Sequence, residues 1–183
     1  MVAAASPTRM TIEEFARITD NGHFDLVDGE VWHVAASGAR HGKYGVRLAR
    51  FLGNHVADVG TGEVYSLEFG YVVRPDEATV LCPDVSFLLA EHVVPDSDDF
   101  HVGPPDLAVE VISPSETSRR VLAKANRYIE AGTSIVWCVY PKKRQIVVYA
   151  ADATPEILGV GDTLTGGSVL PDFALPPATL FEE

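Results

Sequence analysis

The sequence has few cysteines and no long apolar run. Its two cysteines, Cys82 and Cys138, lie in apolar segments without metal-ligand spacing around them, so we expect reduced thiols in a cytoplasmic protein. No segment reaches the roughly 20 apolar residues of a membrane span, and the first ten residues lack the features of a secretion signal. We therefore expect no membrane association. Because phosphate-binding glycine loops and cofactor fingerprints are also missing, a cofactor-dependent small-molecule enzyme is not indicated.

Positive charge is also scarce. The chain has 14 Lys and Arg against 26 Asp and Glu, a net charge of −12, and such a chain as a whole repels a polyanion. Eleven of the 14 cations nevertheless fall into three clusters: Arg40, Lys43, Arg47 and Arg50; Arg119, Arg120, Lys124 and Arg127; Lys142, Lys143 and Arg144. The first cluster occupies one stripe of a predicted helix. A local basic surface for nucleic acid is one interpretation, and solvated charge on an acidic enzyme is the other.

The predicted elements indicate one α/β domain over residues 1–183. A chain of 183 residues can bury a core of its own. A capping box at Thr11 and Glu14 predicts a short helix to about Thr19, and Asp28-Gly29 predicts a hairpin. The pattern continues with a helix over 39–58, strands over 63–73 and 80–89, a surface loop over 91–106, a strand over 107–112, a helix over 117–131 closed by Gly132, and a hairpin over 134–150. This order predicts a mixed central sheet flanked by helices, an α/β (α+β) fold.

Two acidic residues interrupt apolar strands. Glu110 lies within Leu107–Ile112, a segment that is apolar on both faces and should lie inside a covered sheet. Asp84 comes at the start of another apolar strand, after Pro83. A buried carboxylate needs compensation, which a salt bridge or a bound metal can supply. Because two neighbouring strands with one carboxylate each would form the oxygen-rich site that Mg²⁺ prefers, we favour the metal.

A third residue, Lys124, shares one helical face with Val121, Ala125 and Tyr128. A lysine on such a face commonly extends its ammonium to water. Beside two metal-binding carboxylates, the same ammonium could instead orient an attacking water and offset phosphate charge.

These residues lie in segments that resemble one known family. The segments are Cys82 to Phe87, Pro105 to Ser115, Lys124 to Tyr128, and Ala131-Gly132 followed by Val136-Trp137. They are similar to the Uma-two family of putative restriction endonucleases, part of the PD-(D/E)XK nuclease superfamily. The likeness continues through Met10 to Phe15, Phe24 to Glu30, His41-Gly42 and Leu170 to Phe173, and so covers nearly the whole chain.

The resemblance implies a role for each matching residue. Asp84 and Glu110 match the metal-binding acids, and the carbonyl of Val111 would be the backbone ligand of a Mg²⁺ or Mn²⁺ ion. Lys124 matches the family's helical lysine, whereas the superfamily's usual lysine position holds Ile112. The implied activity is metal-dependent endonucleolytic hydrolysis of nucleic acid, with DNA as the expected substrate, by an enzyme expected to be a homodimer. The alternative is a weakly active or inactive nuclease-fold module that binds nucleic acid or a protein.

The chain departs from the family at two further positions: the family commonly has glutamate at Asp25 and an acid at Arg120. Asp25, Glu63 and Glu68 are all candidates for an additional acid at the site, and the sequence does not rank them. Asp106 follows a proline but lies only four residues before Glu110, so we expect it to end the loop. His41 could contact phosphate or metal, although a structural role is the commoner one. Ser113 and Ser115 stand in a helix-capping context.

Overall fold

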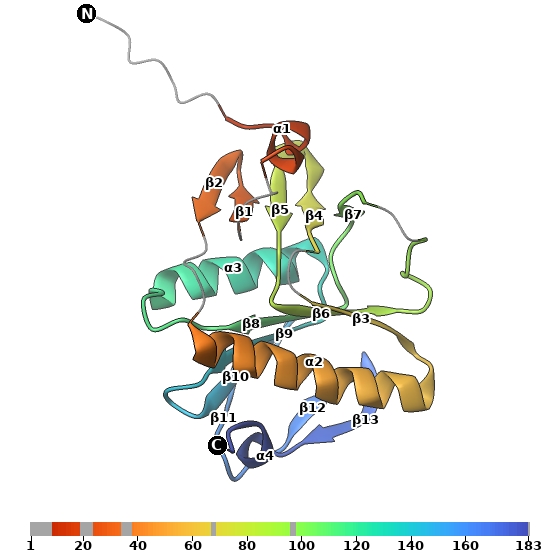
Figure 1. The fold of residues 1–183 in the computed structure, drawn as a ribbon, viewed down its shortest axis with the longest axis vertical. Helices are drawn as coiled ribbons and strands as arrows, with labels where there is room; N and C mark the ends of the chain where they lie inside the picture. Colours follow the sequence, from red (N-terminus) through yellow and green to blue (C-terminus); the bar gives the residue numbers. More distant parts are fainter. Residues whose placement is uncertain (1–8, 19–23, 34–37, 67–68, 96–97, 183) are drawn as a thin grey trace, which may run out of the picture.

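The computed structural model describes residues 9–18, 24–33, 38–66, 69–95 and 98–182 (Figure 1). Its helices are α1 (Ile12–Ala16), α2 (Ala39–Val59), α3 (Ser118–Ala131) and α4 (Pro177–Leu180), with a 3-10 turn, η2 (Pro75–Glu77). No helix within these ranges has both the length and the hydropathy needed to cross a membrane.

A mixed six-stranded sheet lies at the centre, in the order β11-β10-β9-β8-β6-β3. Its strands are β3 (Gly62–Ser66), β6 (Val85–Leu89), β8 (Leu107–Val111), β9 (Ile135–Tyr140), β10 (Gln145–Ala150) and β11 (Glu156–Leu158). β8 and β9 are parallel and the other neighbours are antiparallel. The predicted α/β fold with a mixed central sheet is confirmed, and the apolar strand β8 lies inside that sheet as expected.

A second sheet has five strands in the order β2-β1-β5-β4-β7. They are β1 (Phe24–Val27), β2 (Glu30–His33), β4 (Tyr71–Arg74), β5 (Thr79–Leu81) and β7 (His101–Val102), and the last lies within the predicted loop 91–106. A further pair, β12 (Leu164–Gly166) and β13 (Leu170–Leu175), is separate.

The predicted strands 63–73 and 80–89 were wrong as single strands. Each divides into one strand of the central sheet and one of the second sheet: β3 and β4 in the first case, β5 and β6 in the second. Pro83 lies at the second break, where its missing N–H cannot join a strand ladder. Near the first break, a Cβ on Gly70 would lie 2.6 Å from the Phe100 ring, so only glycine fits there.

The local start and stop signals are confirmed. Thr11 and Glu14 form the predicted capping box of α1, and Asp28 and Gly29 adopt φ of 53° and 76° in the turn between β1 and β2. Thr117 caps α3 and Gly132 ends it with φ of 111°. Ser113 and Ser115 therefore do not cap α3, which was a wrong interpretation; the Ser113 N–H instead donates to the Glu116 carboxylate at 2.7 Å. Cys82 and Cys138 do not form a disulfide with each other, as expected.

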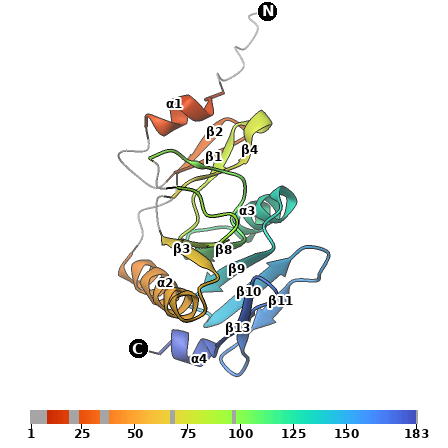
Figure 2. The same cartoon turned by 90° about the vertical axis from the view of Figure 1, so that its right-hand side faces the viewer.

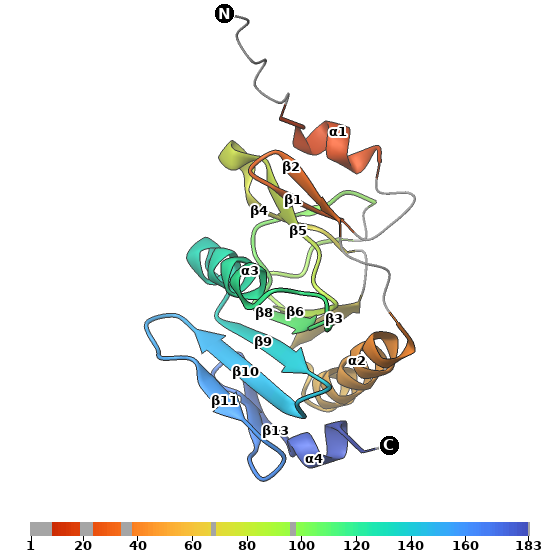
Figure 3. The same cartoon turned by 90° about the vertical axis from the view of Figure 1, so that its left-hand side faces the viewer.

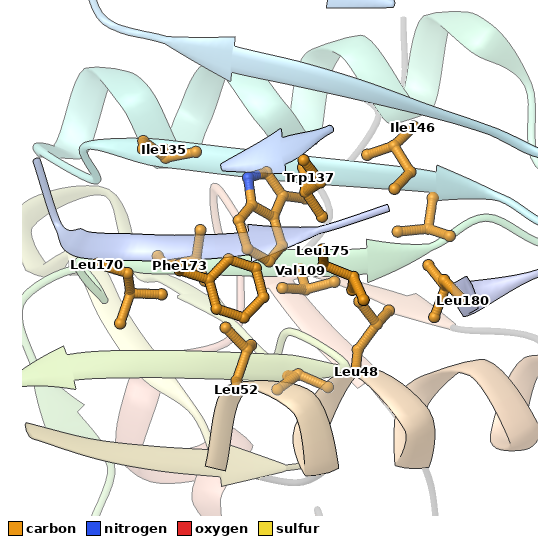
Figure 4. Close-up of a cluster of buried hydrophobic side chains, with 14 of the residues drawn as sticks. Leu48, Leu52, Val109, Ile135, Trp137, Ile146, Leu170, Phe173, Leu175 and Leu180 are labelled. Atoms are coloured by element: carbon orange, nitrogen blue, oxygen red, sulfur yellow. The ribbon is translucent and has the colours of Figure 1, made fainter. Parts of the chain in front are cut away.

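The two faces of the central sheet have different coverings (Figures 2 and 3). On one side α2, β12–β13 and α4 enclose an apolar cluster that includes Leu48, Leu52, Val109, Trp137 and Phe173 (Figure 4). On the other side lie α3 and the second sheet, whose contacts include Leu81, Ala108, Ile112, Ala125 and Tyr128. Side chains alternate along β8, so Glu110 points to the same side as Ala108 and Ile112, toward α3.

Candidate active site

Strand pairing brings the two predicted acids close together. Val85 of β6 pairs with Val109 of β8, and Asp84 and Glu110 are the next residues at this end of the paired segment. The Asp84 carboxyl group is close enough to Glu110 to raise its pKa. Both side chains are buried, with exposed fractions of 8% for Asp84 and 9% for Glu110. The sequence expectation that the two acids lie on neighbouring strands is therefore met.

Asp84 is held by the backbone of β8. Its N–H donates to the Val109 carbonyl at 3.0 Å, and its Oδ2 accepts the Val111 N–H at 2.6 Å. Because Pro83 precedes Asp84, the chain leaves regular pairing here and a side-chain oxygen replaces a backbone acceptor. The carboxylate orientation is thus set by the strand itself.

Lys124 extends from α3 to Glu110. Its Nζ lies 2.9 Å from Oε1 and 3.0 Å from Oε2 of Glu110, and 2.9 Å from Oδ2 of Asp25. The side chain is 9% exposed, so its ammonium does not extend into water. Ile112 lies two residues after Glu110 on the same face, where it packs in the apolar cluster near Val121 and Ala125. Lys124 on α3 thus places an amine beside Glu110, whereas Ile112, two residues after Glu110 on the strand, carries none.

Asp25 is the additional acid at the site. It lies on β1, shares a strand face with Val27, which packs in the cluster near α3, and is 1% exposed. Its second oxygen accepts the Cys82 N–H at 2.9 Å. Of the other two candidates, Glu63 is exposed on β3, and Glu68 lies outside the described residues. The sequence could have favoured Asp25 over the other two candidates, because Asp25 shares a strand face with the apolar Val27 and therefore points inward.

Tyr128 and His41 complete the cluster. The Tyr128 hydroxyl donates to Oε1 of Glu110 at 3.0 Å; its position one turn after Lys124 was the signal for this contact. His41, in the first turn of α2, places Nε2 3.2 Å from Oδ2 of Asp84. The hydrogen bond to Asp84 raises the pKa of His41, against the opposing effect of burial.

The cluster combines three carboxyl groups with one lysine. Lys124 pairs with Asp25 and Glu110, and Asp84 lies close enough to Glu110 to affect its pKa. Burial raises the pKa of Glu110 to about 8; Lys124 opposes this shift, and Asp84 and Asp25 add to it. Burial by itself would lower the pKa of Lys124, but Asp25 and Glu110 outweigh it and raise that pKa. Lys124 is therefore an ammonium, whereas Glu110 is largely protonated near pH 7 unless a further cation lowers its pKa.

Other sequence candidates lie away from this cluster or are used differently. Asp106 accepts the Leu89 N–H at 2.8 Å and pairs with His92 at 2.9 Å, so it fixes the end of the loop as expected. Arg47, from the predicted basic stripe of α2, donates to backbone carbonyls of Leu180 and Glu182. One of the four stripe residues, Arg47, therefore binds the C-terminal segment, and a basic surface for nucleic acid on this stripe stays a prediction.

The donor set suits a hard divalent cation. Within the described ranges, no group of three or more His, Cys, Asp or Glu side chains is arranged to hold a metal. Asp84 and Glu110 alone would leave several positions of an octahedral ion to backbone, water and substrate oxygens, which is the common arrangement for Mg²⁺. Because the pKa of Glu110 is about 8, binding of such a cation would displace a proton from this carboxyl group.

Comparison with known proteins relates the chain to a protein family and to a solved structure. No curated protein matches the chain. A solved structure described as a putative nuclease belonging to DUF820, from Anabaena variabilis, superposes with a TM-score of 0.81 at 16% identity, covering 94% of this chain and 97% of that one. At this identity the likeness shows the fold. The family described as Uma2, putative restriction endonuclease, matches residues 12–178. The chain thus belongs to the Uma2 (Uma-two) family of putative restriction endonucleases.

Proposed function

We propose that this chain is a metal-dependent endonuclease that hydrolyses phosphodiester bonds of DNA, with residues 1–183 acting as one nuclease domain. The main support is that Asp25 and Glu110 both pair with Lys124 in a buried site, with Asp84 close to Glu110. Buried carboxyl groups are costly to ionise unless cations compensate them, and with Lys124 alone the pKa of Glu110 is about 8. A divalent cation would supply the missing compensation, and membership of a nuclease family supports phosphate as the substrate group.

In this proposal Asp84 and Glu110 hold Mg²⁺ or Mn²⁺, together with the carbonyl of Val111. When bound, the ion polarises the scissile phosphate and lowers the pKa of water next to it. The Val111 N–H and His41 fix the orientation of Asp84. Tyr128 fixes Glu110 in the same way.

Lys124 is the proposed catalytic amine. Its Nζ already lies within 3.0 Å of Glu110, so a water bound near Glu110 is within reach of the same ammonium. From there it orients the attacking water and offsets the charge that develops on the phosphate. Asp25 also pairs with the Lys124 ammonium, at 2.9 Å, and acts as a positioning residue.

One observation favours the alternative, a nuclease-fold module that binds nucleic acid or a protein without cutting. Both oxygens of Glu110 accept hydrogen bonds from Lys124 and Tyr128. Together with the net charge of −12, this describes a site that is partly neutralised by the chain's own groups.

A plasmid-nicking assay with Mg²⁺ or Mn²⁺ discriminates between the two. We expect nicking by the wild type, loss of at least about 100-fold in Glu110→Ala and Lys124→Ala, and little change in the matched control Glu63→Ala, an exposed acid on β3. Nicking that survives both site variants would come from another site. A folded wild type that does not nick under any metal condition would support the binding module.

Metal binding can be tested without cleavage. Mn²⁺ should raise the melting temperature, because a ligand at 100 times its Kd stabilises the folded state by about 2.7 kcal/mol. Asp84→Asn should abolish that increase, and Glu63→Gln should retain it. An unchanged increase in Asp84→Asn would place the metal elsewhere. The homodimer stays a prediction, to be checked by light scattering during size-exclusion chromatography.

A further inference from the structure

A cavity opens directly beside the acid cluster. Its volume is about 570 Å³, and its lining includes His41 and Val111. Both residues contact Oδ2 of Asp84, so the cavity and the candidate active site share a wall. Sites for small organic groups typically have about 300–1,000 Å³, and this cavity is large enough for one nucleotide.

The walls of the cavity are largely apolar. Ile112 and Pro114 line one side, and Tyr140 and Pro141 at the end of β9 line another. Ile112 and Pro141 are buried and Tyr140 is half-buried, so these groups are held in place by the core. A planar base can pack against apolar and aromatic walls of this kind whatever its sequence identity.

Cations also line the cavity, and one of them, Lys143, places its Nζ 5.2 Å from the centre of the Tyr140 ring. Arg40 of α2 and Lys142 and Lys143 of the β9–β10 turn line the cavity and are exposed. The same rim includes the N-terminal end of α2, whose cap residue Gly38 makes no side-chain capping bond, and helix N-termini attract anions. Glu116 also lines the cavity, and its carboxylate accepts the Ser113 N–H at 2.7 Å.

We propose that this cavity holds one unpaired nucleotide next to the scissile phosphate. The base packs against Ile112, Pro114 and Tyr140, and the adjacent phosphates lie between Arg40, Lys142 and Lys143. Bases inside a duplex are stacked and cannot enter such a cavity without being extruded. The chain therefore prefers single strands or unpaired ends over intact duplex. This proposal rests on the proposed nuclease function, whose site the cavity adjoins.

The test is fluorescence anisotropy in EDTA, where cleavage does not interfere. The probes are a labelled 20-nucleotide single strand and the blunt duplex of the same sequence, each titrated with the full chain. The rim variant is Lys142→Glu/Lys143→Glu. Its matched control is Arg9→Glu/Arg17→Glu, which changes the charge equally at exposed residues flanking α1.

A second pair of variants changes the cavity itself. Ser118→Trp introduces a large side chain at a lining residue, whereas Ser115→Trp places the same side chain at an exposed residue three positions earlier that does not line the cavity. Circular dichroism verifies that each variant is folded.

We expect the single strand to bind at least 10-fold more tightly than the duplex. The rim variant should weaken single-strand binding at least 10-fold and lower the salt dependence, because each lost phosphate contact reduces the slope by about 0.7. Ser118→Trp should remove the preference for single strands. Both controls should stay within about 2-fold of wild type.

Two results would overturn the proposal: equal affinity for single strand and duplex, or wild-type binding by both the rim variant and Ser118→Trp. If the protein nicks plasmid but gives either result, the cavity proposal is rejected and the nuclease proposal stands. If it binds single strands through the cavity but never nicks, the cavity proposal stands and the nuclease proposal is rejected.

Discussion

The two faces of the central sheet use the same strands for different purposes. Toward α2, β8 presents Leu107, Val109 and Val111 to a cluster of hydrophobic side chains without a buried carboxylate or ammonium group. Toward α3, the same strand presents Glu110, which meets Asp25 and Lys124 within an otherwise apolar cluster. Burial of the hydrophobic side chains on the α2 side lowers the free energy of the folded protein. Burial of the charged groups on the α3 side raises it unless those groups are paired.

The contrast separates residues that stabilise the fold from residues that depend on it. Close packing on the α2 side gives stability that does not depend on ions or pH. The packing on the α2 side fixes the strands of the central sheet, and this holds the charged groups on the α3 side at hydrogen-bond distance from one another. A buried charge cluster of this kind is weak evidence for stability by itself, which is why we assign it a chemical role. The following predictions test the comparison.

The largest loss should follow from Lys124→Ala. It leaves Asp25 and Glu110 buried without their shared ammonium, and breaking a buried pair on one side costs about 3–5 kcal/mol. Urea unfolding in EDTA measures this loss. Mn²⁺ should restore part of the lost unfolding free energy. The double variant Lys124→Ala/Asp25→Asn should regain part of it in EDTA. A loss under about 1 kcal/mol would contradict the proposed charge balance.

Leu52→Ala tests the apolar face. Leu52 is fully buried in the cluster under β8, and removing such a side chain costs about 2–5 kcal/mol. The cost should be equal in EDTA and in Mn²⁺, because no charge is involved. Unfolding in both buffers measures it, and a metal-dependent cost would show that the two faces are coupled.

The pair formed by the exposed His92 and the buried Asp106 should make a smaller, pH-dependent contribution to the free energy of unfolding. The hydrogen bond that the His92 ring N–H donates to the Asp106 carboxylate raises the pKa of His92. Because the folded pKa lies above the unfolded value near 6.5, the stabilisation is complete below pH 6.5 and is lost as pH rises through the folded pKa. NMR titration of His92 should show the raised pKa, and Asp106→Asn should lower it. His92→Gln should lower stability at pH 5.5 and leave it unchanged at pH 9.

The smallest effect should come from surface charge. Arg74 pairs with Glu77 at 2.9 Å and with Glu130, both exposed. Pairs in water contribute at most about 1 kcal/mol, so Arg74→Ala should change the unfolding free energy by less than that, and high salt should remove the difference. A loss near that of Lys124→Ala would mean that burial does not explain the contrast.

Much of the fold follows from short-range signals. The capping box at Thr11, the turn at Asp28-Gly29, and the ends of α3 at Thr117 and Gly132 depend on neighbours within a few residues, and all are confirmed. The placement of Glu110 inside the sheet was also predictable, because a strand apolar on both faces needs cover on both.

Other features depend on pairing between distant segments. The apolar patterns of 63–73 and 80–89 run on across the breaks. Gly70 and Pro83 are local signs of an interruption, but they do not show that each segment divides between two sheets. Arg47 looked equivalent to its neighbours on the basic stripe until the C-terminal carbonyls came within reach.

The sequence by itself determined which residues avoid water and where local turns fall, and hence that Glu110, Asp84 and Lys124 had unusual surroundings. Only the tertiary structure decided that Asp25, rather than the exposed Glu63, joins them. The reason is physical: patterns of three or four residues report on burial and turn geometry, whereas convergence depends on strand order and register, which bring residues 25, 84, 110 and 124 together across about 100 positions of chain.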